Sequence, residues 1–154
     1  YERIPVRTHV VMAGEDVVDV VTSYARKLVK PGDTVFVTEK IVAISQGRAY
    51  PVDEIVARPL ATFLSKYVTK TSHGIGLGIP ETMEMALREC GTPRILLAAA
   101  VAAVTKPFGR KGDFYRVAGP RGGGIDGPTS HTLPPHHQRV VLIPLDSAGV
   151  ARQL

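Results

Sequence analysis

One acidic residue, Asp126, lies in a segment whose residue types suit a bound cation. The segment is GGGIDGPTSHTLPP, residues 122–135. Glycines let the backbone approach a ligand closely, and a carboxylate is a natural oxygen ligand for magnesium or manganese. The same residues also fit a turn in which Asp126 accepts hydrogen bonds before Gly127 and Pro128. On this motif alone the turn is the better-supported interpretation.

A second group of residues carries positive charge that a phosphate could use. Lys40 follows Glu39 at the expected end of a strand, and Arg48 follows Gln46 and Gly47. A lysine offers a point charge to a phosphate, whereas an arginine offers a fork that grips two oxygens. Solvated charges flanking a turn explain the pattern equally well.

Three further motifs are weaker. GIGLGIPE, residues 74–81, leads into an expected helix but lacks the spacing of a known phosphate loop, so a flexible connection is favoured. The spacing of His131, His136 and His137 matches no structural zinc site. Cys90 falls on the apolar face of an expected helix, which favours packing over nucleophilic chemistry.

The elements that must position these residues are helices and strands in a mixed order. Hydrophobic periodicity with Pro, Gly and Asp boundaries predicts helices beginning near residues 17, 59, 80 and 147. Short Val- and Ile-rich or aromatic runs predict strands at 4–12, 34–38, 114–117 and 140–143. The run at 95–104 is apolar on every side, which predicts a buried element, and its alanines favour a helix. We therefore expect an α+β fold, a mixed sheet with flanking helices.

The composition narrows the class of protein. The chain has 154 residues, which suits one domain, and its +5 charge and pI near 9.6 favour an anionic partner. Basic residues are spread out and aromatic residues make up 6%, so nucleic acid is an unlikely partner. The single cysteine favours the cytoplasm. The longest apolar run is too short for a membrane span, and we expect no membrane partner.

Four stretches, taken in order, resemble the gamma-glutamyl ligases that extend the tail of the deazaflavin coenzyme F-420. They are VVMAGEDVVDVV (10–21), KPGDTVFVTEKIVAISQGRA (30–49), GGGIDGPTSHTLPP (122–135) and IPLDSAGVARQL (143–154). The middle of the chain, residues 56–112, carries none of the resemblance. We expect one ligase-like domain over residues 1–154, forming the N-terminal portion of a longer chain.

The resemblance implies a specific chemistry. GTP phosphorylates a carboxylate of an acidic small-molecule acceptor, and the amine of L-glutamate attacks the acyl phosphate to form an amide, with Mg²⁺ or Mn²⁺ holding the phosphates. In this scheme Asp126 is the metal ligand, and Lys40 and Arg48 are the catalytic cations. Gly124, Gly127 and Ser130 contact the GTP cosubstrate. The resemblance also implies a homodimer.

Two departures from the family pattern leave an alternative open. This chain has Ile44 and Gln46 where the family usually has a lysine and a glutamate, and it carries no match to a later aspartate that helps to hold the metal. A non-catalytic binding or assembly module is therefore the alternative. Nucleic-acid binding, suggested by charge alone, is a third and weaker hypothesis.

Overall fold

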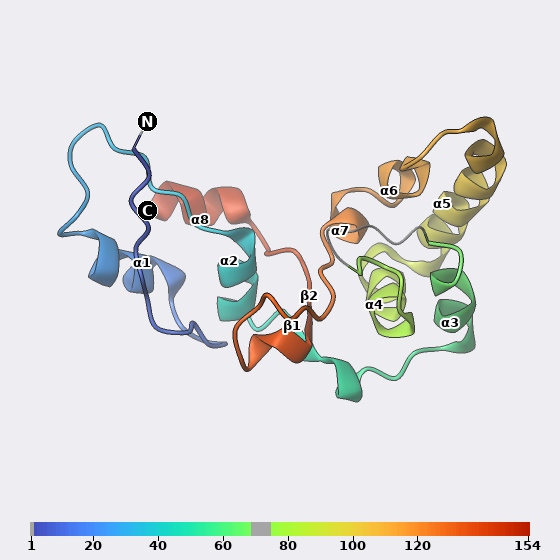
Figure 1. Ribbon diagram of the computed structural model, residues 1–154, viewed down its shortest axis with the longest axis horizontal. Coiled ribbons are helices and arrows are strands. Elements are labelled where there is room, and N and C mark those ends of the chain that lie inside the picture. The colour runs from blue at the N-terminus through green and yellow to red at the C-terminus, as the bar shows by residue number, and fades with distance from the viewer. Residues whose placement is uncertain (1, 69–74) are drawn as a thin grey trace. The chain divides into compact units, whose positions relative to one another are not determined.

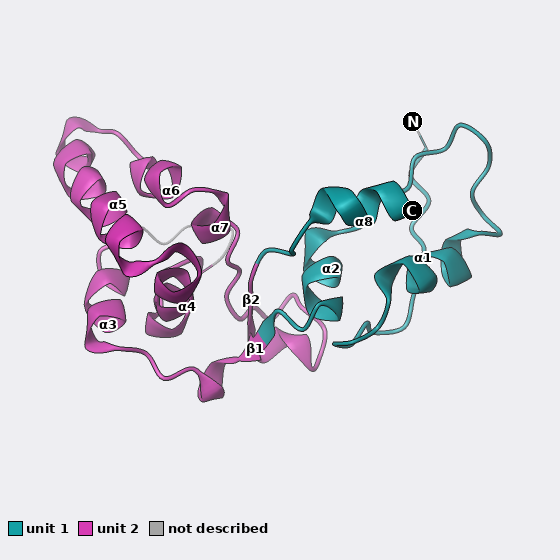
Figure 2. Ribbon diagram, turned by 180° about the vertical axis from the view of Figure 1, so that it is seen from behind, with its two compact units in different colours: residues 1–49, 143–154 teal, residues 50–142 magenta. Residues whose placement is uncertain are grey.

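The computed structural model describes residues 2–68 and 75–154, and its chain divides into two compact units. The first unit comprises residues 1–49 and 143–154, and the second comprises residues 50–142 (Figures 1 and 2). The start of the GIGLGIPE segment, Gly74, lies outside the described residues. In the part of the chain that the structure describes, no helix is long and apolar enough to cross a bilayer.

The first unit contains three helices, each begun by a polar N-cap. They are α1 (Val17–Ala25), α2 (Glu39–Ser45) and α8 (Ser147–Gln153). The side chains of Asp16, Thr38 and Asp146 accept hydrogen bonds from backbone N–H groups in the first turns of these helices. Such caps satisfy donors that a helix leaves open at its start. The predicted starts of α1 and α8 are therefore confirmed.

The strands predicted at 4–12 and 34–38 are wrong. The structure describes both segments, and neither contains a strand. Phe36, in the second of these segments, is 91% exposed, and Thr38 caps α2 instead of ending a strand. A Val-rich run forms a strand when a neighbouring strand and a buried face stabilise it. Among the described residues neither segment pairs with a neighbouring strand, so the local preference for extended backbone does not produce a sheet.

The second unit is mostly helical. Its α-helices are α3 (Pro59–Ser65), α4 (Pro80–Cys90), α5 (Thr92–Thr105), α6 (Asp113–Ala118) and α7 (Pro120–Gly123). Short 3-10 turns are η1 (Val52–Glu54), η2 (Lys106–Phe108) and η3 (His136–Gln138). The strands β1 (Ala49–Pro51) and β2 (Arg139–Val141) pair in a small antiparallel sheet. Helices together with this sheet are compatible with the α+β class, although the sheet has two strands where a larger one was predicted.

The core of the second unit gathers around α4. Its fully buried apolar side chains include Leu77, Met83, Ala86, Ile95 and Val140. Helix α3 packs on α4, and α5 packs on α6. Proline in the first turn begins both α3 and α4, and Gly91, at φ +83°, follows the end of α4. These predicted helices are confirmed.

Two other predictions for this unit need correction. The strand predicted at 114–117 is wrong, because these residues lie within helix α6. The apolar run at 95–104 is helical, as its alanines indicated, but it is not buried on every side. Ile95 and Ala98 face the core, whereas Leu97 is 58% exposed. The helix buries one face against its neighbours and leaves the opposite apolar face exposed.

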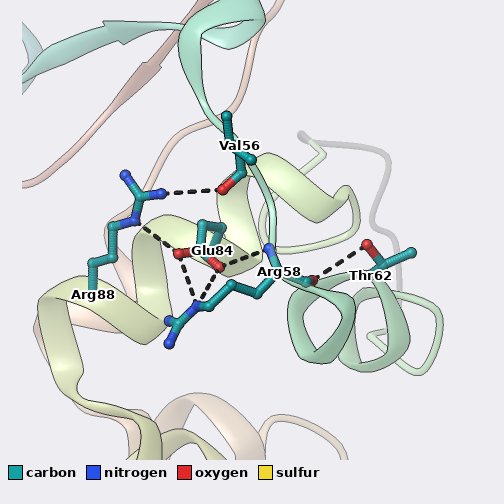
Figure 3. A network of polar contacts seen from close by, with 5 residues as sticks. All are labelled: Val56, Arg58, Thr62, Glu84 and Arg88. Carbon is teal, nitrogen blue, oxygen red and sulfur yellow. Dashed lines mark hydrogen bonds and ion pairs between the residues drawn. The ribbon is translucent and has the colours of Figure 1, made fainter.

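A buried carboxylate joins α3 and α4. The side chain of Glu84 is 2% exposed and accepts hydrogen bonds from Arg58 Nε at 3.0 Å and Arg88 Nε at 2.8 Å. It also accepts from the Arg58 backbone N–H, and Arg88 reaches the carbonyl of Val56 (Figure 3). Burial alone would raise the pKa of Glu84, but the hydrogen bonds from both arginines outweigh it and hold the pKa below 4.5.

The lowered pKa of Glu84 predicts acid sensitivity. A carboxyl group whose pKa is lower in the folded chain stabilises that chain above its ordinary pKa, and this stabilisation is lost as pH falls through the folded value. We expect the free energy of unfolding of the second unit to decrease as the pH falls below 4.5. Urea titrations at a series of pH values measure it. Glu84→Gln, which does not titrate, should flatten the dependence; an equally steep curve in this variant would contradict the assignment.

Candidate functional site

Asp126 is held by its backbone in the second unit. Its N–H donates to the carbonyl of Val141 and its carbonyl accepts from the Val141 N–H, each at 2.9 Å, in an antiparallel bridge. Ile125 and Gly127 on either side are buried, and Asp126 is half-buried. The pairing with Val141 therefore fixes the backbone of Asp126 between two buried neighbours. The predicted turn is thus a bridged extended segment at this residue.

Gly127 brings this segment against the start of helix α4. A Cβ at Gly127 would lie 3.3 Å from Thr82 Cγ2 and 3.4 Å from Ile75 Cβ. The absence of a side chain therefore permits close packing on the residues around the first turn of α4. The N-cap of α4 is Ile79, whose own side chain makes no cap hydrogen bond, and the start of a helix carries partial positive charge. Asp126 therefore directly precedes Gly127, which packs on this positive end of α4.

The other two predicted cosubstrate residues lie in the same segment. Gly124 follows α7 as its C-cap and is exposed, and Ser130 is exposed in a turn. The turn is ordered by Thr129, whose N–H donates to the carbonyl of His137 at 3.1 Å and whose hydroxyl accepts from the His131 N–H. The structure therefore places Gly124, Asp126, Gly127 and Ser130 on one segment of the second unit.

Lys40 and Arg48 belong to the first unit. Lys40 is half-buried in the first turn of α2, which corrects its predicted place at the end of a strand. A cation at the positive end of a helix is unfavourable, so helix stability does not account for a lysine here. Arg48 is half-buried, and its Nε donates to the carbonyl of Ile143 at 2.7 Å. This bond fixes the direction of the guanidinium group.

Sequence reasoning missed the role of Gln46. Its side-chain amide donates to the carbonyl of Leu145 at 2.8 Å and accepts from the Leu145 N–H at 2.7 Å. Gln46 and Arg48 together hold the turn after α2 against residues 143–145, because Gln46 bonds to Leu145 and Arg48 bonds to Ile143. The residue type gave part of the signal, because an amide in place of the family's glutamate can donate as well as accept, but no neighbouring residue indicated Leu145 as its partner.

The pairing of Gln46 with Leu145 predicts the effect of a glutamate at this position. Gln46→Glu removes the donor and places a carboxylate oxygen against the Leu145 carbonyl, so we expect the first unit to lose about 1 kcal/mol of stability. Thermal unfolding followed by circular dichroism measures it. Gln138→Glu, on η3 of the other unit, is the matched control. A Gln46→Glu chain as stable as the parent would show that the pairing contributes nothing.

The described residues do not form a metal cage. Within residues 2–68 and 75–154, no three His, Cys, Asp or Glu side chains are grouped closely enough to hold a metal ion. Magnesium, however, commonly binds proteins through one or two carboxylates while substrate phosphates and water fill its other positions. The single half-buried carboxylate of Asp126 fits a metal of that kind, carried by a nucleotide.

Comparison with known proteins decides the family. A family model described as F420-0:Gamma-glutamyl ligase matches residues 5–154. The chain belongs to this family. The match extends through residues 56–112, where the sequence motifs gave no resemblance, so both units are part of what the ligase family shares. Searches of curated proteins and of solved structures find no match to the chain.

Proposed function

We propose that this member of the gamma-glutamyl ligase family joins L-glutamate to F420-0, or to a related acidic small molecule, in a reaction that requires GTP and Mg²⁺ or Mn²⁺. The observation that carries the proposal is the setting of Asp126. Its backbone is fixed by two hydrogen bonds to Val141, and the residue is half-buried beside the glycine that packs on α4.

The proposed chemistry overcomes the poor reactivity of a carboxylate. An oxygen of the acceptor carboxylate attacks the γ-phosphorus of GTP, and GDP leaves. The amine of glutamate then attacks the acyl carbon and loses a proton, and inorganic phosphate leaves as the amide forms. Phosphorylation thus supplies the leaving group that the free acid lacks. A divalent cation would supply charge neutralisation for the transferring phosphoryl group.

The residues have separate roles in this proposal. Asp126 would hold the cation, whereas Gly124, Gly127 and Ser130 would contact the nucleotide phosphates, because they share its segment. Lys40 and Arg48 are the proposed catalytic cations, which neutralise phosphate or the acidic acceptor. The fixed Nε of Arg48 suits this role, because an oriented guanidinium group loses less side-chain freedom on binding an anion.

A turnover assay tests the proposal. The chain is incubated with F420-0, L-glutamate, GTP and magnesium, and both released phosphate and the mass of the product are measured. We expect phosphate release that depends on glutamate, and a product heavier than F420-0 by one glutamyl residue. Phosphate release without that product would refute ligation. The homodimer and the cytoplasmic location are parts of the same proposal, and sedimentation equilibrium measures the former.

A second candidate is a non-catalytic binding module. It is favoured because the described residues include no group of three His, Cys, Asp or Glu side chains that could hold a metal ion. This candidate predicts that F420-0 or GTP binds without any glutamate-dependent phosphate release. The turnover assay, combined with a binding titration of each small molecule, separates the two.

A further inference from the structure

The outer side of α5 is an apolar surface that the protein leaves exposed. We call it the α5 face; it consists of Leu96, Leu97, Ala100, Ala103, Val104 and Phe108. The exposed fractions are 43% for Leu96, 58% for Leu97, 66% for Val104 and 81% for Phe108. Their spacing of three and four residues places those on α5 along one side of the helix, which η2 extends. None of the six side chains is polar, so hydration of this face is unfavourable.

Basic residues surround the α5 face. Residues 92–118 contain five lysines and arginines and one acid, a net charge of +4, while the whole chain carries +5. Arg94 and Lys106 flank the helix, and Lys111 follows in the next loop; all three are exposed. Most of the chain's net positive charge therefore lies in residues 92–118, the stretch that contains the α5 face.

The single acid of this stretch does not offset the positive surface. Asp113 is 4% exposed and accepts hydrogen bonds from Arg110 Nε at 2.8 Å and Arg116 Nη1 at 3.0 Å. Both arginines are largely exposed, with 62% and 72% of their side chains accessible. The carboxylate lies beneath its two arginines, so the outside of the cluster presents positive charge.

We propose that the α5 face and its basic rim dock on the surface of an anionic lipid bilayer. Apolar side chains bordered by lysine and arginine suit such an interface, where they enter the acyl boundary while the cations meet lipid phosphates. A second copy of the chain is less complementary, because its own α5 face carries the same positive rim. Docking leaves the helix on the surface and needs no spanning segment. This proposal departs from the sequence-based expectation of no membrane partner. That expectation rested on the longest apolar run being too short to span a bilayer.

Two contributions to binding follow from this arrangement. Phe108, at the end of the face, is the most exposed apolar side chain there and should enter the bilayer most fully. Lys106 and Lys111 should add electrostatic attraction that weakens as the salt concentration rises, because ions screen charges at a surface. Neutral lipid should therefore bind the chain poorly.

Vesicle flotation of the whole chain tests the proposal. Vesicles of phosphatidylcholine, with and without phosphatidylglycerol, are compared at low and high salt. We expect flotation with the anionic vesicles at low salt and little with the neutral ones. Lys106→Gln combined with Lys111→Gln should weaken binding by about 20-fold. Val104→Ala combined with Phe108→Ala should weaken it by about tenfold or more.

A matched control separates the α5 face from exposed apolar residues in general. Phe36 is 91% exposed and lies in the first unit, so Phe36→Ala should leave flotation unchanged. Circular dichroism verifies that each variant is folded. The proposal is overturned if the chain does not float, if the α5 variants float as well as the parent, or if Phe36→Ala is equally impaired. It is also overturned if sedimentation shows a dimer that Val104→Glu dissociates while the vesicles bind no protein.

Discussion

Replacing Asp126 with asparagine should lower the rate of the proposed glutamyl transfer by about 100-fold or more, because an amide would not neutralise a cation bound to the nucleotide phosphates. The fold should be preserved. The bridge to Val141 uses the backbone of residue 126, and the side chain is half-buried. The free energy of unfolding should therefore change by no more than about 1 kcal/mol. Steady-state phosphate release at saturating glutamate measures the rate, and urea titration measures the stability.

A neighbouring variant controls for changes in the segment itself. Leu133→Ala alters an exposed apolar side chain in the same segment, at a residue with no proposed role in binding, and removes no charge. We expect a much smaller loss of rate than with Asp126→Asn. Equal losses in the two variants would show that the segment, rather than the carboxylate, supports turnover. A fully active Asp126→Asn would refute the metal role of this residue.

Removing both cations from the Glu84 network strongly destabilises the second unit. The double variant Arg58→Met and Arg88→Met leaves a carboxylate that is 2% exposed with a backbone N–H as its remaining donor in this network. Breaking a buried ion pair from one side commonly costs about 3–5 kcal/mol, and the half-exposed arginines here reduce our expectation to about 2–4 kcal/mol. Urea unfolding at neutral pH measures the loss.

A third substitution distinguishes an unpaired charge from lost packing. Adding Glu84→Gln to the double variant removes the buried charge and should recover part of the lost stability. Lys66→Met, at the end of α3, substitutes an exposed cation and should change stability by less than about 0.5 kcal/mol. If Glu84→Gln recovers nothing, the loss comes from packing of the arginine side chains.

Helix boundaries were predictable because they depend on neighbouring residues. Pro59 and Pro80 begin α3 and α4, Gly91 follows α4, and Asp146 caps α8. Each signal acts within one turn, where sequence spacing and spatial contact coincide. Strands depend on a partner that can lie anywhere in the chain. The segments at 4–12 and 34–38 have strand-like composition, but neither pairs as a strand among the residues described.

The candidate site was predictable in its residue types more than in its placement. The glycines around Asp126 indicated close backbone contacts, and Gly127 does pack closely on Thr82. The sequence could not show that Gly127 packs against α4, because this contact joins residues that are far apart in the chain. The Gln46 pairing with Leu145 spans 99 positions and has no local signal of its partner. The ligase family itself was recognisable because several short motifs occur in the right order.

Calorimetric titration of manganese–GTP into the chain tests the central claim most directly. The account predicts saturable binding that requires the metal, and a loss of about tenfold or more in affinity for Asp126→Asn, while Leu133→Ala binds nearly as the parent does. Binding of equal affinity to the parent and to Asp126→Asn, or no binding to the parent, would contradict it.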